Sequence, residues 1–500
     1  MERLHILSVI IFVPLLGAIA MFFLKEAKLH LAKPIALMVS FFTLASSFNL
    51  LIFSESNLSE FQFREILPWI VQFGINYEVG VDGISLLLVL ITAFLMFLSI
   101  AVSKRDIEHS RAYFGMLLLL ETGILGIFLA LDGILFYVFW ELMLIPAYFL
   151  ISIWGRGKRE GIAIRFVLFT MLGSLLMLVA ILYLGFQAKQ QFGEYSFLLE
   201  DWKKLQLSFE QEMFLFAAFA LAFAVKIPIF PFHNWLLSAH IAAPTAVTII
   251  MSGIMSKLGI YGLIRFCMPI LPQAVASTAP VFMCFAVITI IYGALIAWRQ
   301  TEFKSLLAYS SFSHVGFCVL GYSTLSIEGM QGVVVMMISH AIIVAGLFLL
   351  ADVLYKHHGT YEIAKIQALG KRMPLLAAVL FMFVLASIAF PLTSEFVAEL
   401  LILLAAFKRD YLFGGLAVVG IILGTVYMMS AYRRMVFGVE TVGADCQCGS
   451  HLCVRPNTDI GLRELLVFVP LFILILIIGI NPQPLFNIID QSVMEFLIKN

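Results

Sequence analysis

The sequence predicts an all-α polytopic membrane protein of about 14 transmembrane helices, from its composition, its long apolar runs and the placement of its charges. Hydrophobic residues make up 62% of the 500 residues and charged residues 12%, against about 45–50% and about 25% in soluble globular chains. The mean hydropathy is +1.03, so the chain has too little polar surface to coat a water-soluble particle. These values exclude a soluble enzyme, a disordered regulator and a disulfide-stapled secreted domain.

Runs of about 20 apolar residues recur along the chain, and each is long enough to cross about 30 Å of hydrocarbon as a helix. The runs are continuous rather than alternating, which excludes membrane-spanning strands. The first run contains Ala18-Ile19-Ala20, as a signal peptide would, but it continues to Leu24 and is interpreted as an uncleaved membrane helix. The expected helices span residues 4–24, 34–53, 83–103, 112–131, 133–154, 161–186, 213–239, 244–268, 279–298, 303–323, 330–355, 373–407, 411–436 and 463–480.

Basic residues are distributed unevenly between alternate loops. Of the 31 Lys and Arg residues, 20 lie in loops after odd-numbered helices and nine lie on the other side, which includes both termini. Because basic residues mark the cytoplasmic side, the termini are expected outside the cell. The remaining two, Lys226 and Lys257, fall inside expected helices. The net charge of zero gives no electrostatic reason to expect nucleic acid.

Proline interrupts two of the expected helices. Helix seven is broken within 226–231, which holds two prolines, and helix twelve within 390–394, which holds one. Each proline removes a backbone hydrogen bond, and a break at membrane depth is tolerated where it lines a cavity. The two Phe-Pro pairs lie five helices apart, and an odd-numbered repeat would enter the membrane in the opposite sense.

Charged side chains inside expected membrane helices include Glu141, Lys226, Lys257 and Glu399. Each would cost about 2.5–3.5 kcal/mol at the bilayer centre if it had no partner. Partners or water must therefore offset the cost, and Glu141 with Lys226 is the expected ion pair.

Two histidines inside expected helices, His314 and His340, add groups that titrate near neutral pH. Glu399 lies four residues after Glu395, so both share one helix face. A chain of intramembrane titratable residues is typical of a proton relay. The relay is expected at Glu141, Lys226, Lys257, His314, His340 and Glu399.

The buried titratable residues could instead have structural roles. A membrane histidine often serves packing, a buried Lys–Glu pair serves structure as often as function, and Glu121 is expected to bond a neighbouring helix. Six ionisable positions favour transport over packing. The residues alone indicate an ion-conducting transporter and leave the ion open.

The connections carry weaker signals. A loop before the last helix holds four soft ligands at cramped spacing, for which exposed thiols are the plainer interpretation, so no metal is expected. These weak metal candidates are Cys446, Cys448, His451 and Cys453. Residues 54–80 and 187–212 are expected to be polar outer connections, and 483–500 a short interfacial helix. The chain carries no GxGxxG or Walker A motif and no cysteine ladder, so no cofactor is expected in it.

Several long strings resemble one known family along nearly the whole chain. They are Val81–Ser85, Phe139–Leu150, Val225–Leu236, Lys257–Gly262, Ser310–Gly316, Tyr432–Arg434 and Asp459–Glu464. They resemble the M-type antiporter-like subunits of the proton-pumping NADH:quinone oxidoreductase, respiratory complex I, which are counterparts of the mitochondrial subunit four.

The resemblance implies a fourteen-helix subunit with two inverted five-helix repeats and a proton path through the six relay residues. It implies no cofactor in this chain, and it places NADH, FMN, iron–sulfur clusters and quinone in partner subunits of the complex. It also implies that the chain lies in the cell (inner) membrane of a prokaryote. The expected divisions are N-terminal helices in 1–111, half-channels in 112–268 and 279–436, a cytoplasmic loop in 437–462, and a last helix and tail in 463–500.

This sequence departs from the family pattern near both breaks. Ser238 and Ala242 stand where the family has acids, which removes two carboxylates near helices seven and eight. Leu392 and Ala398 stand where the family has glycine. Three alternatives stay open: a subunit of a related Na⁺/H⁺ antiporter or membrane-bound hydrogenase, a stand-alone solute carrier, and a membrane spacer.

Overall fold

Helix forms at every expected position in the computed structural model, which describes residues 5–54, 61–438 and 459–498. A helix satisfies its backbone polar groups internally, which is what apolar runs in lipid require. Within the described residues, nine helical stretches are long and apolar enough to cross a membrane. Two further apolar helices, Ile6–Phe22 and Pro374–Ser387, are shorter. The chain is a multi-pass membrane protein with a largely helical fold.

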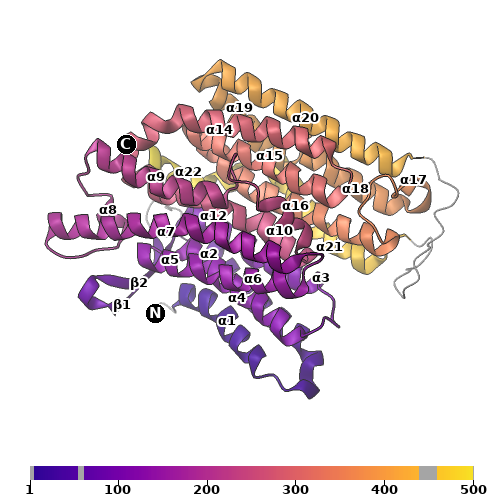
Figure 1. Ribbon diagram of the computed structural model, residues 1–500, viewed down its shortest axis with the longest axis horizontal. Helices are drawn as coiled ribbons and strands as arrows, with labels where there is room; N and C mark the ends of the chain where they lie inside the picture. The colour runs from indigo at the N-terminus through magenta and orange to yellow at the C-terminus, as the bar shows by residue number, and fades with distance from the viewer. Residues whose placement is uncertain (1–4, 55–60, 439–458, 499–500) are drawn as a thin grey trace. The chain divides into compact units, whose positions relative to one another are not determined.

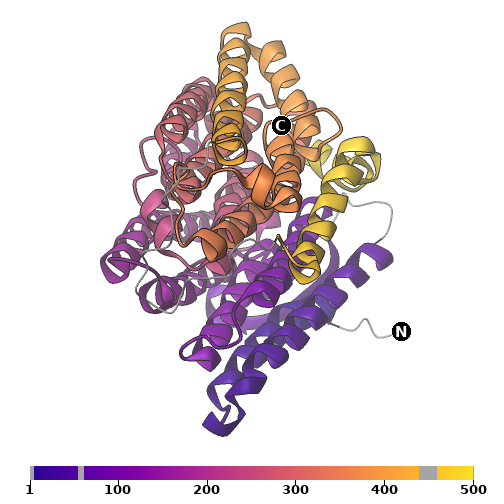
Figure 2. The ribbon, with the colours of Figure 1, turned by 90° about the vertical axis from the view of Figure 1, so that its right-hand side faces the viewer.

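The chain forms two compact units, of which the first holds residues 1–280 and 486–500. In it, α1 packs against α2 and α4, as the indigo and violet helices of Figure 2 show. Its elements are α1 (Ile6–Phe22), η1 (Glu26–Leu31), α2 (Ala32–Phe53), β1 (Gln62–Ile70), η2 (Val71–Phe73), β2 (Ile75–Val81), α3 (Gly83–Val102), α4 (Ser110–Leu129), α5 (Gly133–Leu142), α6 (Leu144–Trp154), α7 (Arg159–Phe192), α8 (Leu199–Trp202), α9 (Phe209–Lys226), α10 (Leu236–Ala242), α11 (Thr245–Ile250), η3 (Met251–Met255), α12 (Ser256–Gly262), η4 (Leu263–Cys267), α13 (Met268–Ile270), the start of α14 (Pro272–Arg299) and most of α22 (Gln483–Ile498).

The second unit holds residues 281–485. In it, α16 packs against α15, α18, α19 and α21, and these helices are labelled in Figure 1. Its elements are the rest of α14, α15 (Phe303–Ser323), α16 (Ile327–His358), α17 (Leu369–Arg372), α18 (Pro374–Ser387), α19 (Ser394–Arg409), α20 (Tyr411–Val436) and α21 (Leu462–Ile480).

Both predicted proline breaks are present. In the first unit α9 ends at Lys226 and α10 begins at Leu236, and the indole N–H of Trp235 donates to the carbonyl oxygen of Val225 across 3.0 Å. In the second unit α18 ends at Ser387 and α19 begins at Ser394. The breaks therefore expose helix ends inside each unit, where side chains and water can reach backbone groups.

The outer connection expected at residues 54–80 differs from the prediction, because part of it forms an antiparallel hairpin. Strand β1 pairs with β2 in a register that sets Glu65 opposite Val79 and Ile70 opposite Ile75. Gly74 makes the turn at φ +64°, in the left-handed region that suits glycine. The buried carboxylate of Glu65 then accepts from the backbone N–H of Leu7 across 2.8 Å, which caps α1.

The tail forms the short helix that the sequence predicts. In the first unit α22 lies against the start of α3, where the Gly83 N–H donates to Ser492 Oγ across 3.0 Å. A β-carbon at Gly83 would lie 2.0 Å from the carbonyl oxygen of Ile488, so only glycine permits this approach. The loop candidates Cys446, Cys448, His451 and Cys453 lie outside the described residues.

Candidate functional site

In the first unit, Glu141 lies at the end of α5, next to a helix break that the sequence did not reveal. Residue Asp132 begins α5 by accepting from the N–H groups of Ile134 and Leu135 at 2.8 and 3.1 Å. The helix stops at Leu142, because Pro146 has no N–H to donate to that carbonyl. The Glu141 side chain is half-buried, and it interacts with Tyr137 one turn earlier.

Lys226 is the last residue of α9, and its side chain is 1% exposed. Its Nζ lies 5.6 Å from the ring centroids of both Trp140 and Phe166. Among the described residues Nζ has no hydrogen-bond partner and no carboxylate within 4.0 Å. Glu141 is the charge that acts on it, through space. The expected direct ion pair is therefore a longer-range electrostatic pair.

Lys257 lies one residue into α12, between two π-helical segments, η3 and η4. Its Nζ donates to the carbonyl oxygen of Ser252 across 2.7 Å and to Ser256 Oγ across 3.3 Å. Short π segments occur often at functional sites, because they widen the helix and expose carbonyl groups. The sequence gives no signal for these π segments, since residues 244–268 have the composition of an ordinary apolar helix.

Close packing holds α12 against α9. A β-carbon at Gly259 would lie 2.8 Å from the carbonyl oxygen of Phe223, and one at Gly262 would lie 2.4 Å from the Phe223 ring. These two glycines let the helix of Lys257 approach the helix of Lys226. The structure thus brings Glu141, Lys226 and Lys257 onto adjoining elements of one unit.

The second unit collects four titratable side chains on three helices, which we call the His–Glu cluster: His314 on α15, His340 on α16, and Glu395 and Glu399 on α19. All four are buried. Glu395 Oε1 lies 3.2 Å from His314 Nδ1 and 3.1 Å from His340 Nδ1. Glu399 Oε1 lies 3.4 Å from His314 Nδ1. The contacts form a continuous line from His340 through Glu395 and His314 to Glu399.

Neighbouring groups orient this cluster. His340 Nε2 lies 2.9 Å from Ser311 Oγ, which holds the imidazole ring from its other side. Gly332 lets α16 approach α19, since a β-carbon there would lie 3.1 Å from the Ala398 carbonyl oxygen. A cavity of about 10 Å³, lined in part by His314, Glu399 and Tyr427, has room for about one water molecule.

Glu395 is the functional candidate that sequence reasoning left out of the relay. Its spacing of four residues from Glu399 was the available signal, because both then project from one face of α19. The break before α19 places Glu395 in the first turn of that helix, where exposed N–H groups favour a carboxylate.

Two other buried charges have structural partners. Arg265, one of the nine basic residues that the sequence assigns to the outer side, is 1% exposed and forms a 2.8 Å ion pair with Asp82. That pair offsets the cost of burying a guanidinium. Without Arg265, the loops after odd-numbered helices still hold most of the Lys and Arg residues, so the expected orientation is unchanged. Glu121 on α4 accepts from Ser40 Oγ of α2 across 3.4 Å, as expected for a bond to a neighbouring helix.

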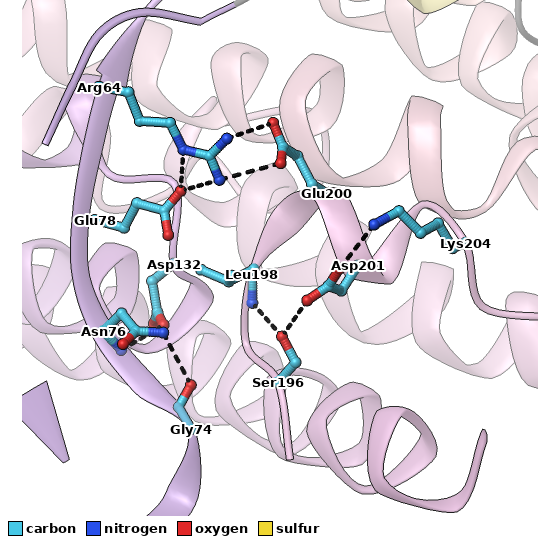
Figure 3. A network of polar contacts seen from close by, with 10 residues as sticks. All are labelled: Arg64, Gly74, Asn76, Glu78, Asp132, Ser196, Leu198, Glu200, Asp201 and Lys204. Carbon is cyan, nitrogen blue, oxygen red and sulfur yellow. Dashed lines mark hydrogen bonds and ion pairs between the residues drawn. The ribbon is translucent and has the colours of Figure 1, made fainter. Parts of the chain in front are cut away.

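A polar network outside the spans connects the hairpin to α5 (Figure 3). Arg64 on β1 forms ion pairs with Glu78 on β2 and with Glu200 on α8. The N–H of Asn76 on β2 donates to Asp132 Oδ2 across 3.1 Å. Burial raises the pKa of both Glu78 and Asp132. Asp132 therefore joins the hairpin to the helix that carries Glu141.

Comparison with known proteins gives one consistent family. A family model described as NADH:quinone oxidoreductase/Mrp antiporter, transmembrane, matches residues 130–424. NADH-quinone oxidoreductase subunit M of Rickettsia prowazekii is 35% identical and covers 100% of both chains. NADH-ubiquinone oxidoreductase chain 4 of Marchantia polymorpha is 34% identical over 98% of this chain and 97% of the relative.

Solved structures agree with this family. A chain of respiratory complex I from Thermus thermophilus superposes with a TM-score of 0.86 at 28% identity, covering 99% of each chain. A chain of the Mrp complex from Dietzia shares the fold, with a TM-score of 0.85 at 21% identity and coverage of 100% of this chain and 98% of that one.

Proposed function

The chain belongs to the family of transmembrane subunits of NADH:quinone oxidoreductase and Mrp antiporters, and we propose that its two buried clusters are the proton relay. It is a proton-translocating membrane subunit of NADH:quinone oxidoreductase, of the subunit M or chain 4 type. As part of this enzyme it assembles with the other subunits of respiratory complex I. Electron transfer from NADH to quinone is coupled there to proton movement.

The redox cofactors belong to other subunits in this proposal. NADH, FMN, the iron–sulfur clusters and quinone bind partner subunits, and this chain holds none of them. The support is the absence of nucleotide-binding and cluster-binding motifs from the sequence. The contribution of this chain is then confined to holding and passing protons.

In the first unit, Lys226 holds a proton whose binding free energy depends on Glu141. At an effective dielectric constant of about 20, bringing two unit charges from about 8 to about 4 Å apart strengthens their attraction by about 2 kcal/mol. Such a change alters proton affinity about thirtyfold. A small movement of α5 relative to α9, driven from the redox subunits, would therefore load or unload Lys226. Lys257 receives the proton on the adjoining helix α12.

In the second unit, the His–Glu cluster carries the proton onward. The proton moves from His340 through Glu395 to His314 along contacts of 3.1 and 3.2 Å, then to Glu399 across 3.4 Å. Imidazole suits this role, because it gains and loses a proton near neutral pH, and Nδ1 of His314 faces both carboxylates. The cavity beside Glu399 admits water for the exit step.

The repeat organisation of the chain is part of the proposal. Residues 1–111 hold the first three helices, 112–268 and 279–436 form inverted half-channels, 437–462 form a cytoplasmic loop, and 463–500 hold the last helix and tail. The broken segments at 227–235 and 388–393 support it, because each interrupts one repeat beside its titratable residues.

The membrane is proposed to be the cell membrane of a prokaryote, with both termini on the outer side. The excess of Lys and Arg in the loops after odd-numbered helices supports this orientation. A cysteine introduced at Lys371 should then add labelling by a membrane-impermeant thiol reagent, beyond that of the unaltered chain, only in inverted vesicles. Additional labelling of this variant in intact cells would contradict the proposed orientation.

Glu141→Gln in the assembled complex tests the relay, because it removes the charge that acts on Lys226 and preserves the side-chain size. Proton pumping in proteoliposomes and NADH:quinone electron transfer should both fall. Glu121→Gln is the matched control, since Glu121 is a buried acid of the same unit that is bonded to Ser40. Normal pumping by Glu141→Gln would contradict the proposal.

A further inference from the structure

The His–Glu cluster has a geometry that proton transfer alone does not require. Two imidazole nitrogens face one oxygen, Glu395 Oε1, at 3.1 and 3.2 Å. One of those nitrogens, His314 Nδ1, also faces Glu399 Oε1 at 3.4 Å. A ring nitrogen carries at most one proton, so the two carboxylates would have to share a single N–H of His314. Donor atoms that converge in this way surround a cation more naturally.

Three of the donor–donor distances match the edges of a small coordination tetrahedron. Zinc is bound tetrahedrally by His nitrogen at about 2.0–2.1 Å and by carboxylate oxygen at about 2.0–2.2 Å, which places neighbouring donors about 3.3 Å apart. The three measured separations run from 3.1 to 3.4 Å. Ligand atoms of His314, His340 and Glu395 all lie within 4.8 Å of one another.

The donor set selects the metal class. Two imidazoles suit Zn²⁺ and related transition ions, whereas Mg²⁺ and Ca²⁺ prefer oxygen ligands alone. Two carboxylates and two neutral imidazoles around a divalent ion also make a neutral group, which a buried site favours. The contact of His340 Nε2 with Ser311 Oγ at 2.9 Å is the outer hydrogen bond that orients a metal-ligating histidine.

We propose that His314, His340 and Glu395 form a binding site for one divalent transition cation of the Zn²⁺ class, with the Glu399 carboxylate beside it. The ligands come from α15, α16 and α19, and the adjacent cavity gives the ion a place to shed its water. Because the ion occupies the atoms that pass the proton, its binding stops proton movement through the second unit. This last consequence rests on the proposed function, whereas binding itself does not.

The test is equilibrium dialysis of radioactive Zn²⁺ against the purified complex in excess Mg²⁺. The wild type should bind one zinc equivalent more than His340→Gln at the same free zinc concentration. Ser311→Ala keeps all three ligands and removes only the outer hydrogen bond, so it should bind that equivalent about 10–100-fold more weakly. Ser311→Ala also decides the question if His340→Gln does not assemble.

His358→Gln is the matched control, because His358 lies on the same helix and its Nδ1 is 3.2 Å from the Leu354 carbonyl oxygen, outside the cluster. It should bind zinc as the wild type does. Equal zinc binding by the wild type, His340→Gln and Ser311→Ala would overturn the site. If the extra zinc equivalent binds without slowing proton pumping, the metal site is upheld and the proposed proton relay through the His–Glu cluster is contradicted.

Discussion

Glu395 on α19 and His340 on α16 meet through a buried contact of 3.1 Å between Oε1 and Nδ1. The two residues are 55 positions apart in the chain. The break before α19 creates the meeting, because it starts a new helix one residue before Glu395. A carboxylate in this first turn is stabilised by the exposed N–H groups of the helix end. Glu395 therefore sits between two histidines that the sequence placed on separate helices.

Replacing Glu395 should interrupt the relay of the second unit. Glu395→Ala removes the carboxylate that contacts both His314 and His340, and loss of a positioned proton-transfer group slows that step by about 100-fold or more. The measurement is the number of protons pumped per NADH oxidised in proteoliposomes. Glu362→Gln, at an exposed ion pair of the same unit with Lys365, should change nothing. Normal pumping by Glu395→Ala would remove Glu395 from the path.

Lys226→Arg separates a proton-carrying role from a structural one. Arginine keeps the positive charge near Glu141 but does not release its proton in proteins. We expect Lys226→Arg to assemble and yet to pump as poorly as Lys226→Ala. Lys189→Arg, near the end of α7, is the control and should pump normally. If Lys226→Arg restored pumping that Lys226→Ala had lost, charge alone would be the function of Lys226.

Asp132→Ala should loosen the connection between the hairpin and α5. Loss of a helix-capping side chain costs about 1–2 kcal/mol. This corresponds to about 5–30-fold faster hydrogen exchange of the N–H groups that donate to Asp132. Hydrogen exchange at Asn76, Ile134 and Leu135 measures this. Asp132→Asn keeps an acceptor oxygen and should retain most of the protection. Asp106→Ala, in an exposed loop, is the control.

The burial of Asp132, unlike its hydrogen bonds, should make the stability of this region fall as pH rises. Burial raises the pKa of Asp132 in the folded protein above the ordinary Asp value of about 3.9. Between the two pKa values the folded state binds more protons, so this contribution to stability is present at low pH and is lost as pH rises through the folded-state pKa. Hydrogen exchange corrected for its intrinsic rate should show this slope. Asp132→Asn should reduce it, and an unchanged slope would contradict the assignment.

Gly479→Ala should destabilise the second break. A β-carbon at Gly479 would lie 2.2 Å from the Leu392 carbonyl oxygen, so α21 could not keep its approach to the break. Overpacking of this kind costs about 1–3 kcal/mol, which should lower the thermal midpoint of the assembled complex. Gly415→Ala is the control, because no atom lies within 4 Å of the added carbon. Equal midpoints for the two variants would contradict this packing argument.

Local physical chemistry made much of the fold predictable. Apolar runs of spanning length predict helices whatever their neighbours are, and the prolines near Lys226 and Phe390 predicted both breaks, since proline cannot donate the hydrogen bond that a helix requires. The hairpin at Gln62–Val81 escaped prediction, because its strands carry a mixed pattern and gain stability from contacts with α1 and α5.

The π segments around Lys257 also escaped prediction, since nothing in their residue types distinguishes them from α-helix. Their place depends on how α12 packs against α9 through Gly259 and Gly262. A close helix contact of this kind is a property of two surfaces and cannot be read from either one alone.

Hydropathy alone identifies this chain as a multi-pass membrane protein, because it is a property of single segments. Which of the charged residues meet depends on the tertiary structure. It separated Lys226 from a direct ion pair with Glu141, paired Arg265 with Asp82, and joined His314 and His340 through Glu395. Such contacts depend on the relative placement of whole helices, which helix packing sets and no local pattern encodes.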